Sequence, residues 1–345
     1  MASSGATSKP IVVVGAGGLG QPIAALLADH GEAVVLLATK GSADRLRGAG
    51  AIELIGVVEK NVPVAAPPAP QRSVGLTDDP RSIKEAQGLI FTTKGHHLPQ
   101  VAGALGHVET GWVLGLQNGI VKNEVLAGVF GWEKVLGAAT IIASGRLPDG
   151  RVALSIPSTT YIGELSGGSS TRVEEIMGKL NEAGLPTLGA DDIRSVEWSK
   201  ACNAVGGFAT TVLGRGFMFR SPDAARAFVG LAKEVAEIAA ASGVQVGDFR
   251  GFSIKSYVSG TIDEGVAAMM EHRSRMPAMQ LPPGVPPPMT SMQRDLENGR
   301  TMEVEEIFAD LAERAQNLGV ATPRLELVRD LMRGINSAQQ QAAHA

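Results

Sequence analysis

The chain is poor in cysteine, in net charge and in long apolar runs. Cys202 is its one cysteine, so no disulfide can form within the chain, as expected in a reducing compartment. The net charge of −4 gives no basic field of the kind that attracts nucleic acid or an anionic membrane. No apolar stretch approaches the length of a membrane span, and residues 1–10 lack the apolar core of a signal peptide. These absences predict a soluble cytoplasmic protein that binds neither nucleic acid nor membranes.

The rest of the composition is that of a globular protein of two domains. The 345 residues are 44% hydrophobic, enough for sizeable cores. Strands alternate with helical segments in the first half, as is typical of right-handed βαβ units with a parallel sheet. After about residue 190 the apolar spacing becomes helical. We therefore expect an α/β N-terminal domain of Rossmann type with a mainly parallel sheet, followed by an all-α C-terminal domain.

The expected boundaries follow from these patterns. We place a disordered N-terminus at 1–10, the dinucleotide-binding domain at 11–189, a helical substrate and catalytic domain at 190–336 and a frayed tail at 337–345. Within them we expect a helix over 78–87 that leads into a strand, antiparallel strands within 135–163 and helices over 250–274, 302–318 and 323–336. Residues 272–288 contain many prolines and are either a lid or a plain linker.

The start of the chain carries the most informative motif. The apolar run Ile11–Val14 ends in a G-x-G-x-x-G sequence, and a helical pattern begins at once. In a βαβ unit the first glycine permits the tight turn, the second lets the backbone approach a pyrophosphate, and the third lets the helix close on the strand. The helix N-terminus offers N–H groups to the phosphates. The motif predicts a dinucleotide site formed by Gly15, Ala16, Gly17, Gly18, Leu19 and Gly20.

The residues after the second expected strand indicate which dinucleotide. Sites for NAD usually place a carboxylate about 20 residues after the glycines, where it binds the ribose 2′-hydroxyl. This chain has Thr39 and Lys40 there instead. A hydroxyl and a cation suit the 2′-phosphate of NADP, so we expect NADPH. The alternative is that Lys40 is an ordinary solvated lysine.

Five separated motifs together resemble the ketopantoate reductase (2-dehydropantoate 2-reductase) family over roughly residues 10–335. They follow the order that is typical of the family. The motifs are the glycine turn, Thr92-Thr93-Lys94, Gln117-Asn118-Gly119, Glu197-Trp198-Ser199-Lys200, and Thr290-Ser291-Met292-Gln293-Arg294-Asp295 with Gly299-Arg300-Thr301-Met302-Glu303-Val304. The resemblance implies NADPH-dependent reduction of a 2-keto acid, most simply 2-dehydropantoate to pantoate.

The resemblance also implies roles for particular residues. Lys200 matches the catalytic acid of the family, and a lysine ammonium can stabilise the charge that hydride attack builds on a ketone oxygen. Asn118 matches an asparagine that contacts the nicotinamide ribose and the substrate. Lys94 matches a lysine that contacts the cofactor. The alternative for Lys200 is a surface lysine of an amphipathic helix, and the alternative for Asn118 is a plain Asn-Gly turn.

Two further matches lie beyond the prolines. Ser291 matches a residue that holds the substrate carboxylate, and Glu303 matches one that contacts the ribose or carboxamide end of the cofactor. On one straight helix they would be about 18 Å apart, so two short helices are required. Thr290 and Gln293 form a capping-box pattern, Asn298-Gly299 is a stop signal, and Thr301 can cap the next helix. The alternative is that both residues serve local capping only.

The chain also departs from the pattern of the family. The family usually has an asparagine four residues after the catalytic lysine, where this chain has Ala204, while Asn203 stands one position earlier. Asn203 is thus a candidate that binds the substrate or orients Lys200. His96 and His97 follow Lys94, but adjacent residues point different ways and have no third ligand nearby, so we expect no metal. These departures leave open a bulkier keto acid or an imine as substrate, as in opine-type dehydrogenases, and a non-catalytic NADP-binding regulator. A homodimer is the expected assembly.

Overall fold

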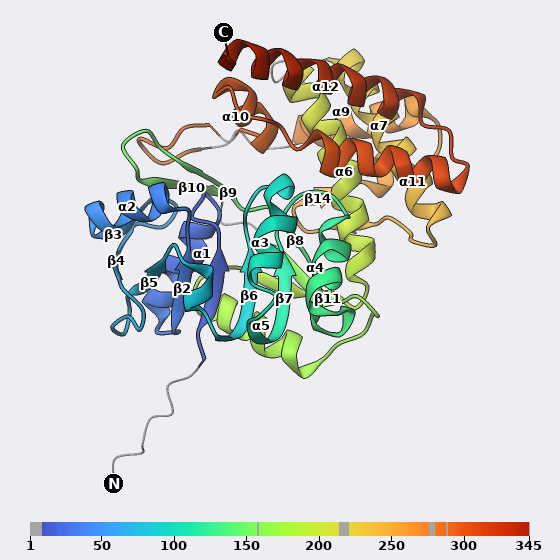
Figure 1. Ribbon diagram of the computed structural model, residues 1–345. Coiled ribbons are helices and arrows are strands. Elements are labelled where there is room, and N and C mark those ends of the chain that lie inside the picture. Colours follow the sequence, from blue (N-terminus) through green and yellow to red (C-terminus); the bar gives the residue numbers. More distant parts are fainter. Residues whose placement is uncertain (1–8, 157–158, 214–220, 276–279, 288, 345) are drawn as a thin grey trace. The chain divides into compact units, whose positions relative to one another are not determined.

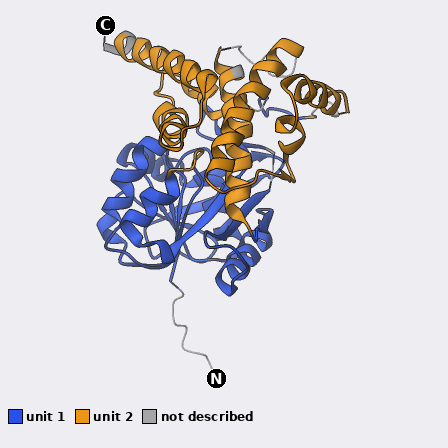
Figure 2. Ribbon diagram, turned by 90° about the vertical axis from the view of Figure 1, so that its right-hand side faces the viewer, with its two compact units in different colours: residues 1–117, 122–191, 281–287 blue, residues 118–121, 192–280, 288–345 orange. Residues whose placement is uncertain are grey.

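The computed structural model describes residues 9–156, 159–213, 221–275, 280–287 and 289–344 and divides the chain into two compact units. The first unit consists of 1–117, 122–191 and 281–287, and the second of 118–121, 192–280 and 288–345 (Figure 2). The main division thus falls at Asp191/Asp192, two residues after the expected boundary. Two short segments, 118–121 and 281–287, belong to the unit opposite to the one that surrounds them in the sequence.

The first unit is built on a twelve-stranded sheet (Figure 1). Its six central strands are parallel neighbours in the order β8-β7-β6-β1-β2-β5. This is the doubly wound order, in which the chain adds strands first on one side of β1 and then, from β6 on, on the other side. The central strands are β1 (Ile11–Val14), β2 (Val34–Leu37), β5 (Val74–Thr77), β6 (Glu85–Phe91), β7 (Glu109–Gly115) and β8 (Val135–Thr140).

Further strands extend both edges of this sheet. On the side of β5 lie β4 (Lys60–Ala65), β3 (Ala51–Gly56), β10 (Val152–Ile156) and β9 (Ala143–Arg146), and on the side of β8 lie β11 (Thr160–Glu164) and β12 (Thr187–Gly189). The pairs β9–β10 and β8–β11 are antiparallel, which confirms the antiparallel strands expected within 135–163. The sheet as a whole is mainly parallel, so the expected fold class of this unit is confirmed.

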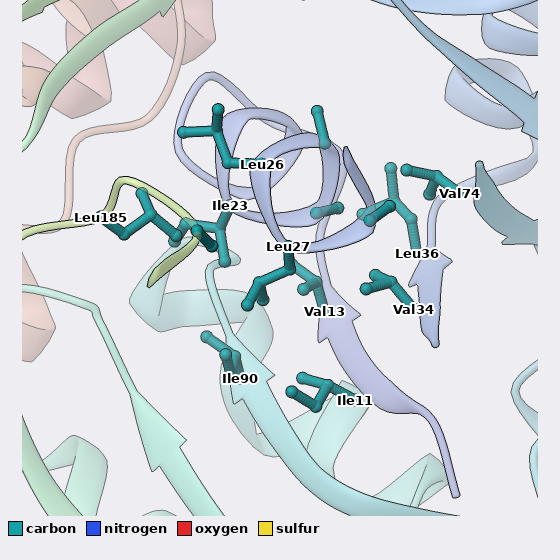
Figure 3. Close-up of a cluster of buried hydrophobic side chains, with 14 of the residues drawn as sticks. Ile11, Val13, Ile23, Leu26, Leu27, Val34, Leu36, Val74, Ile90 and Leu185 are labelled. Atoms are coloured by element: carbon teal, nitrogen blue, oxygen red, sulfur yellow. The ribbon is translucent and has the colours of Figure 1, made fainter. Parts of the chain in front are cut away.

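Both faces of the central sheet are covered, and its inner strands β1 and β2 are apolar and buried at every position. In β1, Ile11 and Val13 pack into one buried cluster, and Val12 and Val14 into another. Figure 3 shows Ile23 and Leu27 of α1 over the first of these faces. Helices α1 (Gly20–His30), α2 (Lys40–Ala49) and α5 (Thr171–Glu182) contribute to the first cluster, and α3 (Leu98–Ala104) and α4 (Lys122–Phe130) to the second. The short 3₁₀ turns are η1 (Pro80–Ser82), η2 (Gly95–His97) and η3 (Trp132–Lys134).

The second unit is helical and has its own core. Long helices α6 (Ile193–Leu213) and α7 (Pro222–Ala241) pack together around residues such as Cys202, Val205 and Phe228. Ser221 caps α7 by accepting a hydrogen bond from the Ala224 N–H at 3.2 Å. The other helices are α8 (Lys255–Val258), α9 (Ile262–Arg275), α10 (Ser291–Glu297), α11 (Asp310–Leu318) and α12 (Pro323–His344).

Several expected elements are wrong in detail. The helix expected over 78–87 is only the turn η1, and β6 already begins at Glu85. The helix expected over 250–274 is a hairpin of β13 (Asp248–Phe249) and β14 (Phe252–Ser253), followed by α8 and α9. Asp248 stabilises the chain after this hairpin by accepting the N–H groups of Ile254 and Lys255 at 2.7 and 2.8 Å. The all-α domain therefore includes one small hairpin.

Both expected loose ends are also corrected. Helix α12 continues to His344, and Gln339 donates to the carbonyl of Leu296 at 2.8 Å, so residues 337–344 are not a frayed tail. At the other end, Lys9 pairs with Glu85 at 2.9 Å and Pro10 accepts the N–H of Gln87. Residues 1–8 of the expected disordered N-terminus, like 276–279 and 288 of the expected lid or linker, lie outside the described residues. No helix in the described ranges is long and apolar enough to cross a membrane.

Candidate functional site

The glycine turn connects the end of β1 to the start of α1. It lies at the point where the order of strand addition changes from one side of β1 to the other. Gly15 has a φ of +113°, which only glycine adopts readily. A Cβ on Gly20 would overlap the Gly15 carbonyl, so the third glycine is required for the close approach of helix and strand. A Cβ on Gly17 would meet nothing within 4 Å. Protein packing therefore does not demand glycine at 17, and the open space there fits a cofactor pyrophosphate.

Two side chains that the motif did not single out hold this turn. The hydroxyl of Thr92, just after β6, lies 2.9 Å from the Gly15 carbonyl oxygen. The amide of Gln21, in the first turn of α1, donates to the Ala16 carbonyl at 2.9 Å. Two sequence signals could have indicated these residues: Thr92 stands two residues before Lys94, and Gln21 directly follows Gly20.

The residues after β2 form a small polar group at the start of α2. Thr39 is the N-cap residue, and its hydroxyl lies 3.2 Å from that of Ser42, which also accepts a hydrogen bond from Arg45 at 2.8 Å. Lys40 is 81% exposed, and its ammonium is 3.4 Å from Asp44. Two hydroxyls and two cations lie here, and no sequence motif indicated the second cation, Arg45. The nearby carboxylate of Asp44 forms an ion pair with Lys40.

The carboxyl ends of β6 and β7 hold polar atoms without partners. Thr93 Oγ1 is buried and accepts or donates no hydrogen bond within the described residues. Gln117 is 6% exposed, and its amide nitrogen and oxygen are likewise buried without a hydrogen-bond partner in the described residues. Thr93 and Gln117 stand at corresponding positions, since Phe91 is paired with Gly115 two residues earlier. Buried polar atoms of this kind need a partner, and a bound cofactor offers one. Lys94 follows as the residue before η2, where the rings of His96 and His97 stack edge to face.

In the second unit, α6 presents Lys200. Its sequence neighbours Trp198 and Cys202 are 3% and 0% exposed, whereas Lys200 and Asn203 are partly exposed. Burial raises the pKa of the Cys202 thiol far above its ordinary value. Lys200 and Asn203 are three residues apart and so share one side of the helix. The position four residues after Lys200, Ala204, packs against the hydrophobic core.

Asn118 belongs to the same unit as α6. Ile120 anchors its segment by joining the hydrophobic cluster that contains Trp198 and Cys202. Gly119 has a φ of +88°, and a Cβ there would lie 2.5 Å from the carbonyl oxygen of Glu306. The turn after Asn118 is thus packed closely on the segment that follows Glu303.

Ser291 is the first residue of α10, as expected. Thr290 caps this helix by accepting the N–H of Gln293 at 3.2 Å, which confirms the expected cap. The Gln293 side chain donates to Glu297 instead of completing a capping box. Thr290 is also hydrogen-bonded to Thr211 near the end of α6, about 16 Å along the helix axis from Lys200. The hydroxyl oxygen of Ser291 is buried and has no hydrogen-bond partner in the described part of the chain.

Glu303 is 3% exposed and precedes a π-helical turn, η4 (Glu305–Ala309). The residue before η4 is Val304, so the expectation that Thr301 caps a helix from 302 is wrong. Asn336 of α12 holds the peptide groups on both sides of Met302, since it accepts the Met302 N–H at 3.0 Å and donates to its carbonyl at 3.1 Å. π-Helical turns are frequent at functional sites because they displace the register of a helix.

The predicted residues thus fall into two sets. The glycine turn, Thr39, Lys40 and Lys94 lie in the first unit, and Asn118, Lys200, Asn203, Ser291 and Glu303 lie in the second. Among the described residues, no group of three or more His, Cys, Asp or Glu side chains could hold a metal ion. The first set has the chemistry of a phosphate and nucleotide site, and the second offers an ammonium, amides, a hydroxyl and a carboxylate.

Two family models cover most of the chain. Residues 11–167 match the model described as "Ketopantoate reductase PanE/ApbA", and residues 192–336 match "Ketopantoate reductase PanE/ApbA C terminal". The chain belongs to the ketopantoate reductase family. It is accordingly an oxidoreductase that acts on CH–OH groups, and the family is nicotinamide-dependent.

Individual relatives agree with this assignment. The chain is 27% identical over 329 residues to a 2-dehydropantoate 2-reductase of Halobacterium salinarum, and the match covers 94% of this chain and 97% of the relative. Among solved structures it is similar to D-mandelate dehydrogenase with NADH and anilino(oxo)acetate, with a TM-score of 0.76, 20% identity and coverage of 96% and 99%. It is also similar to a dimeric ketopantoate reductase from Staphylococcus aureus, with a TM-score of 0.68, 18% identity and coverage of 96% and 99%. At these identities the structural matches establish the fold alone.

Proposed function

We propose that this protein is an NADPH-dependent 2-keto acid reductase whose substrate is 2-dehydropantoate and whose product is pantoate. The observation that carries the proposal is Lys200, a partly exposed lysine held on α6 between buried neighbours, in a chain of the ketopantoate reductase family. The name of the Halobacterium salinarum relative supports the substrate.

The residues of the first unit would hold the cofactor. The N–H groups of the glycine turn would bind its pyrophosphate, and Thr39 and Lys40 its 2′-phosphate. Lys94 would contact the cofactor farther along the sheet edge. The space beside Gly17 and the unpartnered atoms of Thr93 and Gln117 support this fit. When bound, the reduced nicotinamide supplies the hydride.

The residues of the second unit would act on the substrate. As hydride reaches the keto carbon, negative charge develops on the keto oxygen, and the ammonium of Lys200 would stabilise that charge and give up a proton. Asn118 would orient the nicotinamide ribose and the substrate, and Asn203 would bind the substrate or orient Lys200. By its match to the family, Ser291 would donate its unpartnered hydroxyl to the substrate carboxylate. The position of its neighbour Thr290 at Thr211, about 16 Å along α6 from Lys200, does not support this role. Glu303 would contact the cofactor.

A bulkier keto acid is the second candidate substrate. The similar D-mandelate dehydrogenase is solved with NADH and an aromatic oxoacetate, and this chain lacks the asparagine that the family usually places at position 204. Because Ala204 packs against the hydrophobic core, the amide that the family usually has at this position is absent, and Asn203 is the nearest amide to Lys200 on α6.

A substrate panel decides between these functions. Purified protein is assayed with 2-dehydropantoate, phenylglyoxylate and an imine, each with NADPH and with NADH, and the loss of cofactor absorbance is followed. We expect the highest kcat/KM for 2-dehydropantoate with NADPH. A higher kcat/KM for phenylglyoxylate would favour the bulkier keto acid, and turnover of the imine alone would favour an opine-type reaction. Binding of NADPH without turnover of any substrate would indicate a regulator.

A further inference from the structure

Two consecutive carbonyl groups of the glycine turn are held by side chains from outside the turn. Thr92 places its hydroxyl 2.9 Å from the Gly15 carbonyl oxygen and 3.0 Å from that of Val14. The Val14 carbonyl already accepts the backbone N–H of Thr92 at 2.9 Å, so Gly15 depends more on the hydroxyl. Gln21, which is 2% exposed, donates to the Ala16 carbonyl at 2.9 Å.

These hydrogen bonds also fix where the neighbouring N–H groups point. In a trans peptide the C=O and N–H of one plane point in opposite directions. Holding the Gly15 carbonyl toward Thr92 therefore turns the Ala16 N–H away from Thr92, and holding the Ala16 carbonyl toward Gln21 turns the Gly17 N–H away from Gln21. Neither N–H donates to an acceptor within the described ranges, and Gly17 is exposed with open space beside it.

We propose that Thr92 and Gln21 are positioning residues for the cofactor, because they preset the Ala16 and Gly17 N–H groups for the pyrophosphate. The inference rests on the proposed binding of a nicotinamide dinucleotide. The pyrophosphate is common to NADH and NADPH, so these two side chains set the affinity for both and do not select between them. This role requires no contact between either side chain and the cofactor.

The state of Gln21 argues against a merely structural role. Its Oε1 is buried and has no hydrogen-bond partner among the described residues, which costs free energy in the folded protein. A methionine of similar length would fill the same space without this cost. The amide is therefore explained by the one hydrogen bond that it donates, the bond to the Ala16 carbonyl.

The test uses near-isosteric variants of the full chain. Gln21→Met removes the donor to Ala16, and Thr92→Val removes the hydroxyl from Gly15. Thr92→Ser keeps the hydroxyl and serves as the conservative rescue. The matched control is Thr110→Val. Thr110 is a buried threonine near the N-terminal end of β7, away from the glycine turn, and its hydroxyl also donates to a backbone carbonyl, that of Trp112, at 3.1 Å.

The Kd values for NADPH and NADH are measured by titration, together with the thermal midpoint. We expect Gln21→Met and Thr92→Val each to raise both Kd values about three- to tenfold and by the same factor, as for the loss of one neutral hydrogen bond. Thr92→Ser and Thr110→Val should bind both cofactors as the parent does. In an active preparation, KM for the cofactor should rise while kcat at saturating cofactor stays unchanged, and the thermal midpoint of Gln21→Met should not fall.

Three results would overturn the inference. The first is unchanged Kd values in both Gln21→Met and Thr92→Val, and the second is an equal loss of affinity in Thr110→Val, which would indicate general destabilisation. The third is a loss for NADPH alone, which would assign the residues to the 2′-phosphate. If the parent protein bound neither NADPH nor NADH, the proposed function would fail first, and that outcome is distinct from all three.

Discussion

At the residue scale, chemistry and packing separate cleanly on α6. Trp198 and Cys202 are buried in the core, while Lys200 between them and Asn203 after them remain partly exposed. Sequence motifs could find Lys200, Ser291 and Glu303, because each lies in a recognisable run of neighbours. They could not show that Gln21 and Thr92 hold the glycine turn, since the Thr92 contact joins residues 77 positions apart.

Replacing Lys200 tests the proposed acid. We expect Lys200→Ala to lower kcat by about 10²–10⁴-fold, the usual contribution of a positioned acid. Its Kd for NADPH should barely change, because the glycine turn carries most of that binding. Lys255→Ala is the control, since Lys255 is an exposed lysine of α8 in the same unit. Near-native turnover in Lys200→Ala would show that another group supplies the proton.

Replacing Lys40 tests the cofactor preference. We expect the native protein to favour NADPH over NADH by at least about tenfold in kcat/KM, roughly 1.4 kcal/mol. Lys40→Ala should remove most of this preference, and Arg45, hydrogen-bonded to Ser42 nearby, accounts for what is left. Lys60→Ala is the control, because Lys60 pairs with Asp29 elsewhere in the first unit. Equal use of both cofactors by the native protein would contradict the assignment of Thr39 and Lys40.

Replacing Ser291 tests the substrate anchor. One lost hydrogen bond to a charged group is worth about 1.5–3 kcal/mol, so Ser291→Ala should raise KM for keto acids about tenfold or more. An uncharged ketone analogue should be affected far less, because it has no carboxylate. Glu303→Ala should instead raise KM for NADPH. If Ser291→Ala impaired charged and neutral substrates equally, a damaged first turn of α10 would be the better explanation.

At the element scale, the sequence predicted the repeating units well and the irregular elements poorly. The strand–helix–strand pattern of β1, α1 and β2 is visible because every position of these strands is apolar. Residues 85–87 favour a helix locally, yet they form the start of β6, because Glu85 and Ala86 pair with β7. The hairpin at 248–253 and the π-turn η4 have no periodic signature, so apolar spacing merged each of them with the helix that follows.

The junction of β11 and α5 gives a prediction for pH. Glu164 accepts hydrogen bonds from Arg172 at 2.6 and 2.7 Å and from Ser170, the N-cap of α5, at 2.6 Å. Arg172 lowers the pKa of Glu164 from its ordinary value of 4.5. A lowered pKa in the folded state means that the stabilisation is complete above about pH 4.5 and is lost as the pH falls through the folded-state value.

We therefore expect Glu164→Gln to lower the free energy of unfolding at pH 7 by about 1.5–3 kcal/mol. The difference from the parent should shrink as the pH is lowered below about 4.5, as followed by denaturant unfolding at a series of pH values. Asp149→Asn is the control, because the pair of Asp149 and Arg151 is exposed and should contribute little. A difference that stayed constant down to pH 3 would show that the charge of Glu164 is not its cause.

At the whole-molecule scale, the assembly is still a prediction. The ketopantoate reductase of Staphylococcus aureus is described as dimeric, and the homodimer expected from the sequence stays a prediction for this chain. Leu327 and Leu331 of α12 are 61% and 48% exposed and lie one turn apart, so together they are a place where substitution can test a contact with a second copy. Sedimentation should give twice the chain mass of 35.7 kDa, and the double variant Leu327→Lys, Leu331→Lys should give the monomer. A monomeric parent protein would contradict the proposal.

The sequence predicted one domain boundary, whereas each unit of the structure consists of several segments. Apolar spacing shows where helices replace strands, so it locates the change near residue 190. It carries no information on segments such as 281–287, whose Val285 is buried in the first unit beside Gly56. Such a segment is short, contains prolines and has no period, so only the three-dimensional structure assigns it.

This exchange of segments has a consequence for the newly made chain. A ribosome releases residues in order, so the first unit cannot be complete when residue 191 emerges, because 281–287 is still about 100 residues away. At about 5–20 residues per second, the nascent first unit waits roughly 5–20 s with the place of Val285 unfilled. Residues 192–280 of the second unit are synthesised during that interval, so the N-terminal unit reaches its final form only after much of the second unit has been made.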